Sequence, residues 1–132
     1  MSAKKVLSLG QCMADHTGIS WLLSSHFGAE AMPAATFEDA LAKLRQDDFV
    51  LVLVNRILDY DGQRGLDFIT RLKEDEQLRT LPVMLVSNYE DAQQEAVARG
   101  ALPGFGKAEL RQPQTLGRLR AVLDGAPEAP ES

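Results

Sequence analysis

Several features that mark specialised proteins are missing from this sequence of 132 residues. It has a single cysteine, Cys12, so no disulfide can form within the chain. No apolar run approaches the roughly 20 residues that a membrane span needs. The apolar run after the N-terminal lysines is also too short for the core of a signal peptide. We therefore expect a cytoplasmic protein that makes no use of a membrane.

The sequence also lacks the positive charge of a typical nucleic-acid binder. Its 14 lysines and arginines are outnumbered by 19 aspartates and glutamates, so we expect no nucleic-acid partner. The charge is spread unevenly. Residues 1–98 carry nine basic and fifteen acidic side chains, residues 99–123 carry five basic and one acidic, and three acids follow. One segment near the C-terminus is therefore basic in an otherwise acidic chain.

What is present is the composition of an ordinary folded domain. Hydrophobic residues make up 45% of the chain and charged residues 25%, which argues against disorder. The length suits one domain and leaves little room for a second. We expect this domain to span residues 1–124. Residues 125–132, rich in proline, alanine and glutamate, are expected to form a disordered tail.

Three short runs of apolar residues predict buried strands, at 6–9, 49–54 and 82–86. Each run is nearly continuous rather than alternating, which is typical of parallel strands that are covered on both faces. Weaker strands are expected near 31–34 and 102–105, the second made poor by Pro103 and its glycines.

Helical periodicity separates these strands. Apolar residues recur at the 3.6-residue spacing of a helix, and local residues suggest the helix ends. The expected helices run from Asp15 as N-cap to Gly28, from Thr36 to Leu44, onward from Gly65, from Glu90 to Arg99, and around 116–123. Strands that alternate with helices predict an α/β fold with right-handed crossovers and a parallel sheet.

In such a sheet, ligands bind at the carboxyl ends of the strands, so functional residues are expected there. The residues that follow the predicted strands are Gly10-Gln11-Cys12, Asn55-Arg56, Ser87-Asn88 and Lys107. Because parallel strands end at the same edge, these groups are the candidates for a common site.

Three segments resemble the receiver domain of two-component response regulators. They are Leu81–Ser87 (Leu-Pro-Val-Met-Leu-Val-Ser), Gly65–Ile69, and Gly100-Ala101 seven residues before Lys107. The resemblance extends from about Lys4 to Leu123. It implies a five-stranded, parallel, doubly wound sheet of order 2-1-3-4-5 in a flavodoxin-like three-layer sandwich. It also implies phosphoryl transfer from a histidine kinase to an aspartate, assisted by a magnesium ion on acidic residues.

The family's chemical pattern is only half kept. Ser87 and Lys107 match the positions that hold the phosphoryl group, but Gly10 and Gln11 stand where the acidic metal-binding pair is expected. Asn55 stands at the phosphoacceptor position, and an amide does not form an acyl phosphate. Gly104 occupies the position of the usual aromatic switch residue. The resemblance is therefore to a degenerate, or pseudo-, receiver.

These losses predict a binding module rather than an enzyme. We expect no catalytic residue, no metal and no cofactor, and a polar plug in which Asn55 hydrogen-bonds to Lys107. Function is expected to rest on phosphorylation-independent contact with a protein: a kinase, a regulator or a second copy of the chain. The basic segment is either a solvated surface or the partner face, with Arg99, Arg111, Arg118 and Arg120.

Three alternatives remain open at this stage. Asp59 or Asp61, in the loop after the third strand, is a candidate for a displaced phosphoacceptor. An FMN-type cofactor is a second possibility, with residues 15–20 as a phosphate-gripping loop and Tyr60 and Tyr89 beside the ring. Cys12 and His16, four residues apart, would suit a metal pair, although no further cysteine exists to complete it.

Overall fold

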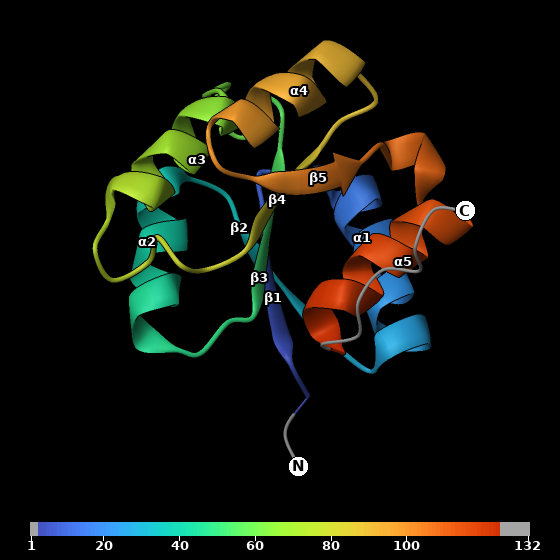
Figure 1. Cartoon of the computed structure of the whole chain (residues 1–132). Helices are drawn as coiled ribbons and strands as arrows, with labels where there is room; N and C mark the ends of the chain where they lie inside the picture. The colour runs from blue at the N-terminus through green and yellow to red at the C-terminus, as the bar shows by residue number, and fades with distance from the viewer. Residues whose placement is uncertain (1–2, 125–132) are drawn as a thin grey trace.

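The computed structural model describes residues 3–124, which form one parallel sheet between two layers of helices (Figure 1). The neighbouring strands pair in parallel in the order β2-β1-β3-β4-β5. This order confirms the expected doubly wound α/β fold. The strands are β1 (Lys5–Leu9), β2 (Glu30–Ala34), β3 (Leu51–Asn55), β4 (Val83–Val86) and β5 (Leu102–Phe105).

The helices cover both faces of the sheet. Figure 1 shows α1 and α5 on one side and α2, α3 and α4 on the other. No helix within residues 3–124 is long and apolar enough to cross a membrane. The helical elements are α1 (Met13–Phe27), α2 (Phe37–Gln46), α3 (Gly65–Glu74), α4 (Glu90–Ala98), the 3-10 turn η1 (Lys107–Glu109) and α5 (Pro113–Leu123).

Side chains of the strands alternate between two apolar cores. Leu53 and Val86 pack with α1 and α5, whereas Val54 and Leu85 pack with α2, α3 and α4. Both faces of the central strands are therefore buried, which explains why these strands are continuous apolar runs in the sequence. Burial of each such side chain contributes about 1.5–3 kcal/mol.

Local capping chemistry decides where several helices begin and end. The Thr36 hydroxyl accepts a hydrogen bond from the backbone N–H of Asp39 at 3.1 Å, as expected for an N-cap. Gly28 ends α1 in the left-handed conformation, with φ at 61°. The expected start of α1 is wrong, because Cys12 is the N-cap and Asp15 lies in the first turn. The expected tail at 125–132 lies outside the described residues.

Both edge strands contain a proline, which has no N–H to offer a further strand: Pro33 in β2 and Pro103 in β5. Side chains occupy other backbone groups of these edges. Lys43 Nζ donates to the carbonyl of Pro33 at 2.6 Å. The N–H of Gly104 donates to Gln93 Oε1 at 3.1 Å, and its carbonyl accepts from Arg118. The two edges are thus partly capped from the helical layers.

Candidate functional site

The carboxyl ends of β3, β4 and β5 surround a cavity of about 190 Å³, called here the central cavity. Asn55, Ser87 and Lys107 line it, so three of the positions taken from the sequence meet in one place. Arg56, Asn88 and Tyr89 also line it. Gly10 and Gln11, from the end of β1, are not among the residues that line this cavity.

Asn55 is the last residue of β3 and is 7% exposed. Its Nδ2 donates a hydrogen bond of 3.0 Å to the carbonyl oxygen of Gly10. A carbonyl oxygen only accepts, so this bond fixes which end of the amide faces Gly10. The buried amide is thus held in one orientation by the end of β1, and no carboxylate stands at this position for phosphoryl transfer.

Position 10 is closed to any side chain. Gly10 has φ at +77°, and a Cβ there would lie 2.5 Å from Leu58 Cγ. The loop after β3 therefore packs into the space where the family carries an acid. The Gly10 carbonyl also accepts the N–H of Asp59 at 2.9 Å, which ties this loop to the end of β1.

Gln11, which follows Gly10 at the end of β1, has its side-chain amide buried. Neither Nε2 nor Oε1 finds a hydrogen-bond partner among residues 3–124. The side chain of Gln11 thus brings no negative charge to this end of the sheet.

Lys107 pairs with Asp15 of α1, at 2.8 Å between Nζ and Oδ2. The expected hydrogen bond between Asn55 and Lys107 is therefore wrong: Asn55 bonds to Gly10, and the ammonium takes a carboxylate in preference to a neutral amide. The Lys107 ammonium holds the pKa of Asp15 below its ordinary value, with a smaller effect in the same direction from the Cys12 thiol. Asp15 thus neutralises the charge that Lys107 brings to the site.

Ser87 lies directly after β4 and is 5% exposed. Its hydroxyl oxygen accepts the backbone N–H of Tyr89 at 3.1 Å, which leaves the hydroxyl proton available to a ligand. Arg56 lies over the ring of Tyr89, with 4.7 Å between the guanidinium carbon and the ring centroid. This cation–π contact positions a second cation at the rim of the cavity.

The donor set of the central cavity does not fit a magnesium ion. Magnesium prefers octahedral oxygen ligands that include carboxylates. No aspartate or glutamate lines the cavity, and Arg56 and Lys107 bring positive charge to it. Within residues 3–124 there is no group of three or more His, Cys, Asp or Glu that could hold a metal, which also leaves Cys12 and His16 without further ligands.

A glutamine of α4, Gln93, contacts the ends of both β4 and β5. The Gln93 amide donates to the carbonyls of Leu85 at 2.8 Å, Ser87 at 3.1 Å and, more weakly, Phe105 at 3.4 Å. Its oxygen accepts the N–H of Gly104. A Cβ at position 104 would lie 2.1 Å from the Leu85 carbonyl oxygen, so this position too excludes a side chain.

The four arginines of the possible partner face make different contacts. Arg111 lies over the Trp21 ring at 5.0 Å, and Arg120 lies over the Phe27 ring at 6.0 Å, both rings belonging to α1. Arg118 donates to the Gly104 carbonyl of β5.

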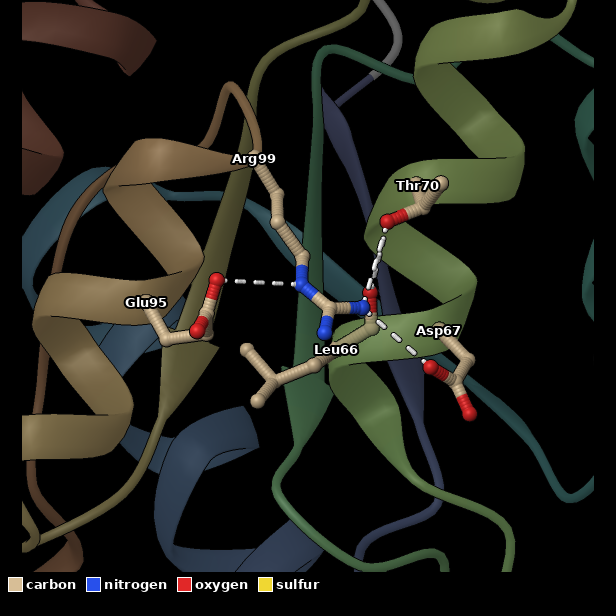
Figure 2. Close-up of polar contacts among 5 residues, drawn as sticks. All are labelled: Leu66, Asp67, Thr70, Glu95 and Arg99. Atoms are coloured by element: carbon tan, nitrogen blue, oxygen red, sulfur yellow. Dashed lines mark hydrogen bonds and ion pairs between the residues drawn. The ribbon is translucent and has the colours of Figure 1, made fainter.

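Arg99, the fourth of these arginines, turns to the opposite layer of helices (Figure 2). Its guanidinium donates to Asp67 and to the hydroxyl of Thr70 on α3, each at 3.2 Å, and its Nε donates to Glu95 at 3.4 Å. The guanidinium of Arg99 is thus held between α3 and α4, apart from the α1 rings that Arg111 and Arg120 contact.

The alternatives from the sequence find little support in the geometry. Residues 15–20 lie inside α1, so they form no phosphate-gripping loop. Tyr60 is 75% exposed and contributes to none of the cavities described here. Asp61 belongs to an exposed turn in which its carboxylate accepts the N–H of Gln63 at 3.1 Å. Asp59 is exposed in the same loop.

Sequence reasoning missed the roles of three residues: Asp15, Arg56 and Gln93. Asp15 was interpreted as a helix cap, although a carboxylate one turn after the end of the first strand is a candidate partner for Lys107. Arg56 directly follows a strand that ends at the site, and this position is its only sequence signal. The contacts of Gln93 depend on the approach of α4 to β5, which no local pattern reveals.

No family model matches the sequence, and no curated protein matches it. Solved structures do match its fold. The chemotaxis response regulator CheY4 of Vibrio cholerae is 23% identical, with a TM-score of 0.70 over 92% of this chain and 100% of that one. A response regulator from Thermotoga maritima is 21% identical, with a TM-score of 0.75 over 93% and 99%.

The phosphorylated cyanobacterial phytochrome response regulator RcpA is a third match. It is 21% identical, with a TM-score of 0.71 over 95% of this chain and 97% of that one. At these identities the likeness establishes the fold alone: the chain has the α/β architecture of response regulator receivers.

Proposed function

We propose that this chain is a receiver-like signalling module that binds a protein partner without being phosphorylated itself. The observation that carries the proposal is Asn55, a buried amide hydrogen-bonded to Gly10, at the end of the strand where a receiver needs its aspartate. The fold shared with solved response regulators supports a place in a two-component or phosphorelay system.

The surroundings of Asn55 support the loss of phosphotransfer. No carboxylate lines the central cavity, so a divalent cation would find no carboxylate ligand there and would meet the positive charge of Arg56. Position 10 has no room for an acid beside Leu58. Restoring the chemistry would thus require several coupled changes, which is what a module with no use for phosphoryl transfer would accumulate.

The contact between α4 and β5 supports an output that does not switch with phosphate. In place of an aromatic side chain that can change position, Gln93 holds the ends of β4 and β5 through its hydrogen bonds. Any change of state would then come from partner binding, through a difference in affinity for two conformations.

The partner is a protein: a kinase, a regulator or a second copy of the chain. Its contact is proposed on the α1–α5 side, where Arg111 and Arg120 stack on aromatic rings and form no ion pair within residues 3–124. Trp21 is half exposed on the same side. Tryptophan and arginine are enriched among the residues that dominate binding energy, and the positive charge favours an acidic partner surface.

Incubation with acetyl phosphate and Mg²⁺, followed by intact-mass measurement, tests the loss of phosphotransfer. We expect no gain in mass, while an ordinary receiver treated in parallel gains one phosphoryl group. A gain that Asp59→Asn or Asp61→Asn abolishes would show a displaced acceptor and contradict the proposal.

Charge reversal tests the partner face. The double variant Arg111→Glu/Arg120→Glu is expected to lose, in a pull-down from the native cell, a partner that the unchanged chain retains. The matched control is Arg71→Glu/Arg79→Glu, which reverses two exposed arginines on or near α3. Retention of the partner by the first variant, or equal loss in the control, would contradict this placement.

A further inference from the structure

A second hollow lies between the loop after β3 and the first turns of α4, and we call it the α3–α4 hollow. Its volume of about 600 Å³ is in the range of pockets that take small molecules. Arg56, Ile57 and Tyr89 line both this hollow and the central cavity, whereas Ser87 and Lys107 do not line it. The α3–α4 hollow is therefore separate from the position where a receiver holds its phosphoryl group.

One wall of the hollow is basic, and the backbone of the loop holds it in shape. Ile57 and Arg64 form an isolated antiparallel bridge, and the N–H of Gly65 donates to the carbonyl of Arg56 at 2.8 Å. The loop thus closes on itself, which keeps the two arginines on the same wall. Ile57, together with Leu66 at the start of α3, adds apolar surface to this wall.

The other wall is acidic and belongs to α4. Asp91 and Glu95 are one helical turn apart, so their side chains lie on the same face of the helix. Oδ1 of Asp91 accepts the N–H of Ala92 at 2.9 Å, which leaves Oδ2 available to a ligand. Glu95 is held by Arg99 at 3.4 Å, and Figure 2 shows Leu66 of α3 directed toward α4 near this pair.

The opposite charges of the two walls do not neutralise each other by direct contact. The ion pairs among residues 3–124 include none of Arg56, Arg64 and Asp91. Arg56 reaches the α4 wall through the ring of Tyr89 instead. Two arginines and two acids line the hollow, so its formal charges cancel and neither a simple anion nor a simple cation is favoured. A molecule that carries both charges can pair with both walls at once.

We propose that the α3–α4 hollow binds a small zwitterion of the amino acid class, free or as a short peptide, with an apolar side chain. Its carboxylate binds the basic wall, chiefly Arg64, and its ammonium binds Asp91. Its side chain packs against Ile57 and Leu66. This goes beyond the proposed function, which assigns no ligand to the hollow. Failure of this binding would leave the proposed protein contact untouched, because that contact lies on the α1–α5 side.

The test is a titration of the ¹⁵N-labelled chain with L-leucine at constant ionic strength. We expect saturable shifts of the amide signals of Ile57, Arg64 and Ala92. Leucinamide lacks the carboxylate, and N-acetyl-leucine lacks the ammonium. Each is expected to bind about tenfold more weakly than leucine, because each loses one charge-assisted contact. Equal binding of all three compounds, or linear shifts that do not saturate, would overturn the proposal.

Two variants assign the charges of the ligand to the two walls. Arg64→Gln is expected to raise the Kd of leucine about tenfold and to reduce the preference for leucine over leucinamide. Asp91→Asn is expected to raise the Kd by a similar factor and to reduce the preference for leucine over N-acetyl-leucine. Both side chains are exposed, so neither variant disturbs the core. Unchanged preferences in both variants would contradict the assignment of the walls.

The matched controls are Arg71→Gln on α3 and Asp48→Asn before β3. They change the net charge by the same amounts at exposed positions outside the hollow. Both are expected to keep the Kd of the unchanged chain, and equal weakening in the controls would refute a site in the hollow.

The dipeptide Leu-Leu, titrated in the same way, separates the two sources of the zwitterion. Tighter binding of leucine assigns the hollow to a free amino acid, and tighter binding of the dipeptide assigns it to a short peptide. Binding of neither compound would overturn the proposal.

Discussion

Gly10 takes part in the packing at the end of β1. Its φ of +77° is a conformation that residues with a Cβ rarely adopt, and Leu58 occupies the space that a Cβ would need. The carbonyl of Gly10 holds both the Asn55 amide and the N–H of Asp59. Gly10 therefore attaches the loop after β3 to the end of β1.

Replacing Gly10 with alanine is expected to destabilise the fold by about 2 kcal/mol or more, because backbone strain and overpacking against Leu58 add. Urea denaturation of the purified chain measures this. Gly117 in α5 is the matched control, since a Cβ there meets nothing within 4 Å. Gly117→Ala is expected to stabilise the helix by about 0.5–1 kcal/mol. Equal stability of Gly10→Ala and the unchanged chain would refute the account of this position.

The Asp15–Lys107 ion pair makes the stability of the fold depend on pH in the acidic range. Lys107 lowers the pKa of Asp15 from its ordinary value of 3.8, so the pair contributes fully above that value. Its contribution is lost as pH falls through the lowered folded-state pKa. Both side chains are about one-third exposed, and solvent screening keeps the effect below about 1 kcal/mol.

Asp15→Asn is therefore expected to flatten the loss of stability below about pH 5. Denaturation at a series of acidic pH values measures the slope, with Asp59→Asn, at an exposed carboxylate outside any ion pair of the described chain, as the control. A slope unchanged in Asp15→Asn but altered in the control would show that the pair is not formed in solution.

Among the secondary-structure elements, α4 is attached to the sheet by Gln93. A single side-chain amide contacts the ends of both β4 and β5. On the other side, Arg99 ties the end of α4 to α3. This helix is therefore fixed from two directions.

Gln93→Met keeps the length of the side chain and removes its hydrogen bonds. It is expected to destabilise the fold by about 1–3 kcal/mol, because buried carbonyls lose their donor. Amide exchange of Gly104, whose N–H donates to the Gln93 oxygen, is expected to accelerate. Gln94→Met, at the next and exposed position of α4, is expected to change neither quantity. Unaltered exchange of Gly104 in Gln93→Met would argue against the contact.

The sequence predicted the features that neighbouring residues determine, and it missed those that depend on residues distant along the chain. Three of the strands followed from continuous apolar runs, and the helix ends at Thr36 and Gly28 followed from capping chemistry within one turn. The predicted start of α1 was wrong because aspartate is a common N-cap residue. The Asp15 carboxylate instead pairs with Lys107, which is distant in the sequence. The contacts of Arg99 with Asp67 and Thr70 of α3 join residues about 30 positions apart, so no local pattern reveals them.

At the scale of the whole molecule, Gly10, Asn55 and Gly104 lie toward the carboxyl end of the sheet, and neighbouring groups fix each of them. Leu58 occupies the space that a Cβ at position 10 would need, the Gly10 carbonyl holds the Asn55 amide, and Gln93 with the Leu85 carbonyl encloses Gly104. The resemblance of the sequence to receivers drew attention to these three residues, whereas their contacts required the three-dimensional arrangement.

Because no carboxylate lines the central cavity, Mg²⁺ is expected to leave the thermal midpoint of unfolding unchanged. Differential scanning calorimetry with a few millimolar MgCl₂, compared with NaCl at equal ionic strength, measures this. A rise of the Tm that appears with Mg²⁺ and disappears with EDTA would contradict the absence of a cation site from the described part of the chain.

The capped edges of the sheet have a consequence for handling the protein. Exposed strand edges are the usual starting points for aggregation and strand exchange between chains. Here Pro33 and Pro103 withhold N–H groups, while Lys43, Gln93 and Arg118 occupy backbone groups that an incoming strand would need. We therefore expect concentrated solutions to stay free of fibrils, and any self-association to proceed through helix surfaces instead of an extended common sheet.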